Sequence, residues 1–259
     1  MKNILWLSFL FALFFIACDD DSSTSSSAKA VDKVDEPAES VEPTEVTGGF
    51  MTDTRDGHTY KTVTIGSQTW MAQNLNYKAD SSWCGGGVKI ARIEGDCSKY
   101  GRLYSWAAAM DSAGTWSTSG RGCGYGLTCT SIGTVRGVCP EGWHLPDSAE
   151  WRALIDLGGG KRAAGKVLKS MSGWERINDN GEYTDRGNGT DAISFSALPA
   201  GLRKSDGFFH DKGDRANFCS STENGGINAY IMFLTFDKNE AFLDNYYKNY
   251  AYSVRCIKD

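Results

Sequence analysis

The chain has 259 residues, of which 27 are basic and 32 acidic, and its formal net charge is −5 at pH 7. The negative charge lies in the segment 18–49, which holds two lysines and nine acids, whereas residues 50–259 hold 24 basic and 23 acidic side chains. A nearly neutral folded part without a basic stripe excludes the electrostatic footprint of a nucleic-acid-binding protein. Because no Pro/Ser/Thr-rich break divides residues 50–259, we expect one globular domain there.

Residues 1–17 have the pattern of a lipoprotein signal peptide. Lys2 is followed by an apolar run over 4–16, which is shorter than the ~20 residues of a membrane-spanning helix. Ala17 then precedes Cys18, as in a bacterial lipobox, so we expect cleavage before Cys18 and attachment of lipid to its sulfur. The alternative is a plain secretory signal with an incidental cysteine at position 18.

Residues 18–49 are predicted to form a disordered, acidic tether that carries the lipid. The segment has no aromatic residue before Phe50, so it cannot bury enough apolar surface to offset its ordering entropy. As a coil it would span roughly 30 Å, enough to hold a domain clear of a membrane. We therefore expect a lipid-anchored protein of the bacterial cell envelope, at the outer membrane or cell surface. The acidic residues 19–21 leave the choice between inner and outer membrane open.

Two elements are predicted in the first half of the domain. Residues 59–65 and 68–72 contain β-branched residues on either side of a Gly-Ser turn, which predicts a hairpin. Residues 103–110 include three consecutive alanines, which favours a short helix.

The stretch 138–151 has the pattern of a cysteine anchor, a proline-bracketed turn and a helix start. Asp147 can cap the first turn, and Glu150, three residues later, can close a capping box. Apolar residues recur at helical spacing over 151–157 until three glycines end the helix. We interpret the stretch as a fold-defining corner, in which His144 has a core or hydrogen-bonding role.

The second half is predicted to contain one more helix, a long loop and a terminal meander. A short helix is expected over 163–171, and residues 172–228, rich in Gly, Asn and Asp, are expected to be mostly loop. Residues 229–236 are apolar on both faces, as in a central strand, and 241–247 return beside them. Alternation over 250–256 predicts a closing strand.

Several motifs, in their order along the chain, resemble the Fibrobacter succinogenes major paralogous domain family over residues 50–259. They are the opening segment 56–77, YGRLYSW (100–106), CPEGWHLPDSAEW (139–151), NGTD (188–191), FSALPAG (195–201), SSTE (220–223) and the closing SVRCIKD (253–259). The family is similar in fold to the C-type-lectin-like proteins and to the formylglycine-generating, sulfatase-modifying enzymes. The resemblance implies a disulfide-stabilised α+β, C-type-lectin-like fold with two or three short helices, a long loop region and a small antiparallel sheet.

Eight cysteines on an exported chain indicate disulfides, and one of them, Cys18, is set aside for lipid. The expected pairs are Cys84 with Cys97, Cys123 with Cys129, and Cys139 with Cys256. The last pair corresponds to the whole-domain disulfide of the lectin-like folds that the family resembles. Cys219 is left over and is expected to be a small buried hydrophobe, and the cysteine spacings fit no zinc site.

The preferred functional hypothesis is a non-catalytic binding module, with a glycan, a cell-wall polysaccharide or a surface protein as its partner. In lectin-like folds the long loop presents the ligand-contacting residues, where aromatic rings stack on sugars and polar side chains hold hydroxyl groups. The candidate ligand-binding residues are Trp174, Arg203, Phe208, Arg215 and Glu223, with Tyr183, Arg186 and Phe209 on the same loop. The alternative for Trp174 and one of the phenylalanines is a place in the core.

The alternative function is a formylglycine-generating-enzyme-like or glycan-active enzyme, although no catalytic residue is assigned. The formylglycine-generating enzymes need reactive cysteines just upstream of their last strand, and residues 244–250 contain none. Acid pairs such as Asp206 with Asp211, or Glu182 with Asp185, could in principle serve hydrolysis. Scattered loop carboxylates are usually only solvated, so we expect no enzyme.

No cofactor is expected, and calcium is the one ion that the sequence leaves open. Residues 178–181 resemble an EF-hand loop, but with Gly181 at the sixth position the register puts Arg176 at the first ligand position. The remaining candidate oxygen ligands are Asp185, Asn188, Asp191 and Glu223.

Overall fold

The computed structural model describes residues 45–88, 92–129, 133–177 and 183–259. The predicted signal peptide 1–17, the lipidation site Cys18 and the predicted tether as far as residue 44 lie outside these residues. No helix within the described ranges is long and apolar enough to cross a membrane. The first strand begins at Val46, so the folded part starts before the expected boundary at residue 50.

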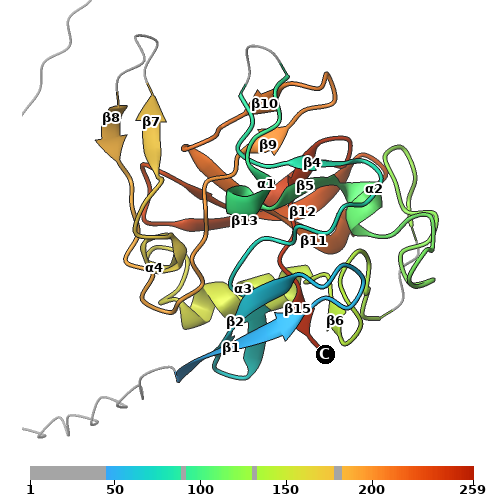
Figure 1. Ribbon diagram of the computed structural model, residues 1–259, viewed down its shortest axis with the longest axis horizontal. Helices are drawn as coiled ribbons and strands as arrows, with labels where there is room; N and C mark the ends of the chain where they lie inside the picture. The colour runs from blue at the N-terminus through green and yellow to red at the C-terminus, as the bar shows by residue number, and fades with distance from the viewer. Residues whose placement is uncertain (1–44, 89–91, 130–132, 178–182) are drawn as a thin grey trace, which may run out of the picture. The chain divides into compact units, whose positions relative to one another are not determined.

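A small antiparallel sheet joins the beginning, the middle and the end of the domain (Figure 1). Its five strands, in spatial order, are β1 (Val46–Thr52), β2 (Thr59–Ile65), β3 (Gln68–Met71), β15 (Ile257–Lys258) and β6 (Trp143–His144). β2 and β3 form the predicted hairpin, with Val63 opposite Trp70. β15 pairs with β3 on one side and with β6 on the other, so the last strand completes the sheet.

A second sheet contains eight strands. Along its main path the order is β10 (Phe209–His210), β9 (Leu202–Arg203), β14 (Ala251–Ser253), β11 (Arg215–Asn224), β12 (Asn228–Thr235) and β13 (Ala241–Tyr247), while β5 (Arg102–Ser105) pairs with β14, and β4 (Ser82–Cys84) pairs with β5. The pairings are antiparallel except that β11 and β14 meet in parallel at Phe218 and Ser253. β12 and β13 confirm the strand and the return strand predicted at 229–236 and 241–247.

The helix predicted over residues 103–110 is wrong in its first half. Residues 102–105 form β5, which is paired with β4 on one side and with β14 on the other. Only α2 (Trp106–Ala109) is helical. Leu103 and Tyr104 are completely buried, so sheet pairing outweighs the helix propensity of the alanines that follow.

Residues 172–228 are not mostly loop, contrary to the prediction. They contain the hairpin of β7 (Glu175–Ile177) and β8 (Tyr183–Arg186), the short pair β9 and β10, and the ten-residue strand β11. β11 is buried over residues 216–221, and Asn217, Ser220 and Ser221 are polar. These polar groups find internal partners: the Asn217 side chain donates to the Gly201 carbonyl at 3.2 Å. Buried polar residues therefore mask the apolar pattern of this strand.

The closing strand predicted over 250–256 is shorter than expected. Only residues 251–253 are in β14, and β15 follows in the other sheet. Residues 251–257 are all buried and do not alternate, because both faces of the segment are covered: Ala251 packs in the cluster of Leu103 and Phe209, Tyr252 in that of Tyr104, and Ile257 in that of Trp151.

The predicted corner is confirmed. α3 (Ser148–Leu157) begins with a complete capping box: the Asp147 carboxylate accepts two backbone amides of the first turn at 2.7 and 2.8 Å, and the Glu150 carboxylate accepts the Asp147 amide at 2.8 Å. Trp151 of α3 packs on Trp70 of β3 and on Phe218 of β11, with ring centroids 4.7 and 5.7 Å apart. The corner therefore joins α3 to both sheets. The other helices, α1 (Cys97–Tyr100) and α4 (Ala164–Leu168), are four and five residues long.

The three expected disulfides are present, and they link Cys84 with Cys97, Cys123 with Cys129, and Cys139 with Cys256. Cys219 is free and buried, and burial raises the pKa of its thiol, so it is an inert part of the core. The domain is thus an α+β fold, mostly β-sheet with short helices, stabilised by disulfides.

Candidate functional site

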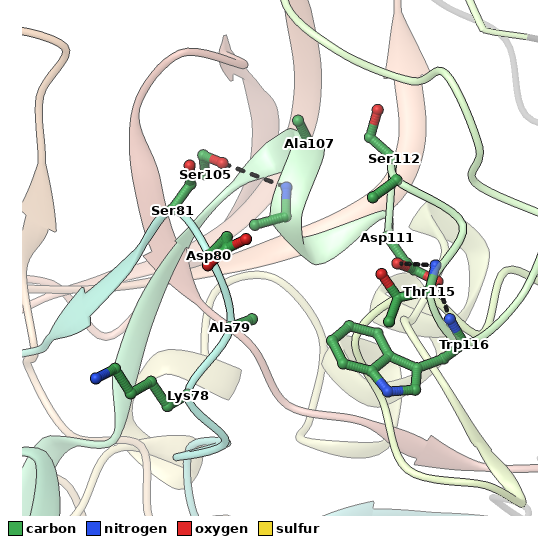
Figure 2. A pocket seen from close by; sticks show the side chains of 12 residues that line it. Lys78, Ala79, Asp80, Ser81, Ser105, Ala107, Asp111, Ser112, Thr115 and Trp116 are labelled. Carbon is green, nitrogen blue, oxygen red and sulfur yellow. Dashed lines mark hydrogen bonds between the residues drawn. The ribbon is translucent and has the colours of Figure 1, made fainter.

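A pocket of about 380 Å³ lies where three segments of the first half of the domain meet (Figure 2). The segments are residues 78–81, which lead into β4, the beginning of α2, and the loop 111–116 that follows α2. The lining side chains combine one aromatic ring, four alanines, hydroxyl groups and a lysine with two aspartates; they are Lys78, Ala79, Asp80, Ser81, Ser105, Ala107, Ala108, Asp111, Ser112, Ala113, Thr115 and Trp116.

Asp111 builds the loop on one side of the pocket. Its backbone is left-handed, with φ of +55°, and the residue is buried. One carboxylate oxygen accepts the Thr115 amide at 2.9 Å, and the other accepts the Trp116 amide at 2.7 Å (Figure 2). The second oxygen also accepts the Ser117 amide at 3.0 Å. Because both oxygens hold the loop together, this carboxylate is not available as a general base.

Trp116 supplies the aromatic wall of the pocket. Its indole points from the loop toward residues 78–81 (Figure 2). Behind it, the ring meets Tyr77 edge to face at 5.4 Å, and the guanidinium of Arg55 lies 3.9 Å from the Tyr77 ring centroid and 5.1 Å from that of Trp116. Asp53 holds Arg55 in turn through an ion pair of 2.7 Å. The indole is therefore fixed before any ligand arrives.

The polar groups of the pocket suit a ligand with many hydroxyl groups. Ser105 caps α2, where its hydroxyl oxygen accepts the Ala108 amide at 3.2 Å and keeps its own proton free to donate. Lys78 and Asp80 add a charged donor and a charged acceptor on the side of the pocket opposite the loop 111–116 (Figure 2). The lining residues include no histidine and no cysteine, so the pocket offers hydrogen bonds and ring stacking without a paired nucleophile and base.

The predicted ligand-binding residues do not form one cluster, and the prediction that Trp174 contacts a ligand is wrong. Its ring is completely buried, and the indole N–H donates to the Ser170 hydroxyl at 3.0 Å and to the Ala197 carbonyl at 3.1 Å. Trp174 therefore belongs to the core, which was the alternative prediction. Its two acceptors supply the internal partner that a buried indole N–H needs.

Glu223 and Arg215 also have internal contacts. Glu223 forms an ion pair of 2.7 Å with buried Lys248 and accepts the Cys129 amide, so it holds the Cys123–Cys129 loop against the sheet. The Arg215 guanidinium lies 4.4 Å from the Phe233 ring centroid. Arg203 and Phe208 lie together near the β9–β10 turn, while the side chains of Tyr183 and Arg186 fall outside the described residues.

None of the pocket residues was predicted to bind a ligand, because they all lie outside the expected ligand loop, 172–228. A usable signal exists: Trp116 stands in a stretch of Gly, Ser and Thr, where an aromatic residue has few apolar neighbours in sequence. What fixes its ring, however, comes from Arg55 and Tyr77, which are far away along the chain.

His144 has the hydrogen-bonding role that the sequence predicts. Its Nδ1 lies 2.7 Å from a carboxylate oxygen of Asp259 and its Nε2 lies 2.8 Å from one of Glu150. Ser221 lines a second pocket together with His144, but both imidazole nitrogens are occupied, so His144 cannot take a proton from that hydroxyl. The group is a structural bridge between the corner and the end of the chain.

Replacing His144 by Gln is expected to destabilise the domain more at pH 6 than at pH 9. Burial by itself lowers the pKa of His144, but the hydrogen bonds to Glu150 and Asp259 outweigh it and raise the pKa above its ordinary value of 6.5. Such a group stabilises the fold below pH 6.5 and loses its effect as the pH rises through the raised value. We expect the free energy of unfolding, measured in urea, to fall by about 1–2 kcal/mol at pH 6.

Exposed His58 offers the matched control, since His58→Gln removes an imidazole that donates no hydrogen bond to a carboxylate among the described residues. An equal loss for His144→Gln at both pH values would contradict the charged bridge.

The candidate calcium ligands have internal partners. The Asn188 side-chain oxygen accepts the Trp174 amide at 3.1 Å, and the Asp191 carboxylate accepts the amide and hydroxyl of Ser196. Within the described ranges no three His, Cys, Asp or Glu side chains gather as a metal site would need. The EF-hand-like residues 178–181, together with Glu182, lie outside those ranges, as does the side chain of Asp185.

A scan against protein-family models matches residues 63–258 to the Fibrobacter succinogenes major domain. The chain belongs to this family. Searches of curated proteins and of solved structures returned no match. The matched range contains the pocket, the arginine at the β9–β10 turn and all three disulfides, so these are parts of the Fibrobacter succinogenes major domain itself.

Proposed function

We propose that this Fibrobacter succinogenes major domain is a non-catalytic, glycan-binding module of a lipid-anchored protein of the bacterial envelope. The observation that carries the proposal is the pocket beside Trp116. It unites a pre-fixed indole, on which a sugar ring can stack, with hydroxyl groups and two opposite charges that can hold sugar hydroxyls. Among the residues that line the pocket the buried carboxylate is that of Asp111, and it is engaged by three backbone amides, which argues for binding and against hydrolysis.

A C-type-lectin-like arrangement is part of the proposal. It is supported by the short helices, the two antiparallel-rich sheets and the disulfide between Cys139 and Cys256, which links the start of the corner to the end of the chain. The lipid at Cys18 and the tether 18–49 would then hold such a domain away from the membrane, where a polysaccharide can reach it.

The test is a glycan array probed with the full chain in detergent, followed by titration of each bound glycan. We expect Trp116→Ala to weaken binding at least about tenfold, which corresponds to about 1.4 kcal/mol. Tyr125→Ala is the control, because Tyr125 is an exposed aromatic residue outside the pocket. Tyr125→Ala should unfold at the urea concentration of the parent, whereas Trp116→Ala should unfold at a lower one because its partly buried ring packs on Tyr77. Binding is therefore compared under conditions in which both variants are folded.

Two outcomes would overturn the proposal. A chain that binds no glycan, or that binds as well without the Trp116 ring, has its function elsewhere. Turnover of a labelled polysaccharide would make the domain an enzyme, which was the alternative hypothesis.

A surface protein is a second candidate partner, favoured by a patch of exposed apolar side chains. Tyr125, Leu127, Ile227 and Tyr247 are each about half exposed. Backbone hydrogen bonds from Gly126 to Gly226 and from Lys248 to Ile227 bring their segments together. Cross-linking on intact cells would recover such a partner, and loss of the cross-link in Leu127→Ser would locate it at this patch.

A further inference from the structure

Two arginine side chains meet beside the β9–β10 turn. Arg203 ends β9, and Arg92 comes from the segment between β4 and α1. A side-chain carbon added to buried Gly207 would lie 3.0 Å from Nη2 of Arg203 and 3.5 Å from Nε of Arg92. The two guanidinium groups are thus separated by no more than the sum of those distances. Burial lowers the pKa of Arg203; among its charged neighbours Glu94 and Asp206 raise it, while Arg92 lowers it as an adjacent cation does.

Each of these guanidinium groups lies on an aromatic ring. Arg203 is 3.9 Å from the ring centroid of Trp83, and Arg92 is 4.6 Å from that of Phe208. Stacking orients the planar groups and leaves their N–H edges free, which is the geometry that carboxylates and sulfates recognise.

The described part of the protein supplies no hydrogen-bond acceptor for these N–H groups. Across the described residues, no hydrogen bond and no ion pair within 4.0 Å is made by either guanidinium group. The two acids nearby accept backbone amides: Glu94 that of Cys84 at 2.7 Å, and Asp206 that of Phe208 at 2.9 Å. One amide leaves each carboxylate its charge, so the two acids nearly balance the two guanidinium groups. What fits an external anion is the set of N–H groups without a protein acceptor.

The arginine pair and the pocket beside Trp116 share one face of the larger sheet. Ala251 of β14 lies opposite Arg203 of β9 and opposite Ser105 of β5, and the Ser105 amide donates to the Ser81 carbonyl. Residues directly opposite each other point to the same face, so this row runs from Arg203 to the pocket residues Ser105 and Ser81. Three strand spacings of about 4.8 Å make it about 14 Å long.

We propose that Arg203 and Arg92 form an anion subsite, and that the domain binds an acidic glycan whose carboxylate or sulfate group lies on these two guanidinium groups. A neighbouring sugar of the same chain occupies the pocket beside Trp116. The inference rests on the proposed glycan-binding function and names its ligand class.

The test compares acidic oligosaccharides with their neutralised forms on the full chain. The probes are uronate oligomers against their methyl esters, and sulfated oligomers against their desulfated forms, titrated calorimetrically at low and high salt. We expect the best acidic oligomer to bind at least about tenfold more tightly than its neutral form, with the difference shrinking at high salt.

Substitutions then separate this subsite from the pocket. Arg203→Gln and Arg92→Gln should each weaken the acidic form about tenfold and leave the neutral form unchanged, while exposed Arg162→Gln changes neither. Equal affinity for the two forms, no binding of any acidic oligomer, or indifference to both arginine variants overturns the inference. If Trp116→Ala leaves both forms unaffected while Arg203→Gln weakens the acidic one, the anion subsite stands and the pocket function fails.

Discussion

Replacing Cys139 and Cys256 together by serine is expected to lower the free energy of unfolding by about 4–5 kcal/mol. The disulfide joins residues 117 positions apart, and the chain-entropy contribution of such a link grows with the loop it closes. Locally it anchors β15, a two-residue strand that by itself could not remain between β3 and β6. Urea denaturation of the oxidised parent and the double variant measures the difference.

Two control variants distinguish the link from the mere loss of buried sulfur. Cys219→Ala removes a buried thiol that is in no disulfide and should cost about 1 kcal/mol. Serine at both Cys123 and Cys129 opens a loop of only 6 residues in separation and should cost about 2 kcal/mol. A double variant at 139 and 256 that is as stable as Cys219→Ala would contradict the role assigned to the disulfide.

Arg255→Lys is expected to lower the free energy of unfolding by about 2–4 kcal/mol, although it keeps the charge. Arg255 is completely buried between the rings of Phe195 and Phe218, at 4.3 and 5.3 Å. Its guanidinium donates to the Asn74 side chain at 2.9 Å and to the carbonyls of Phe195 and Ser196. A lysine ammonium cannot reach these acceptors in three directions, so at least one is left buried and unpaired.

The same guanidinium fixes a backbone that is otherwise unfavourable. Asp191, Ser194 and Ser196 all have left-handed conformations, with φ of 48, 55 and 52°, which non-glycine residues seldom adopt. Arg162→Lys is the matched control, because Arg162 is exposed and its replacement should change stability by less than about 0.5 kcal/mol. If the two lysine variants unfold at the same urea concentration, the hydrogen bonds of the Arg255 guanidinium do not stabilise the fold as proposed.

The parts of the fold that the sequence predicts are those whose determinants are close along the chain. The capping box of Asp147 and Glu150 and the hairpin over 59–71 are written in neighbouring residues, and the structure contains both. β5 and β11 depend on partners far away. β5 is a strand because β14, near the end of the chain, pairs with it, and β11 buries polar residues whose hydrogen bonds lie outside the strand.

The candidate site was harder to predict than the fold, because no local pattern sets it. Trp174 and Trp116 are both tryptophans beside glycine or serine in the sequence, yet one is a core residue with two internal acceptors and the other lines the pocket. Arg203 and Phe208 were both among the residues predicted to bind a ligand, but the convergence of Arg203 with Arg92 depends on tertiary packing around Gly207.

The position of β15 between β3 and β6 sets the order in which the domain can mature. The hairpin and the corner are synthesised first. Their common sheet lacks β15, the strand between β3 and β6, until residues 257 and 258 have been added. During that delay Cys139 has no native partner, while the cysteines at 84, 97, 123 and 129 are already available to it. If the chain is exported as proposed above, we expect correct oxidation to come after translocation is finished, with thiol-exchange catalysts speeding the recovery of chains oxidised too early.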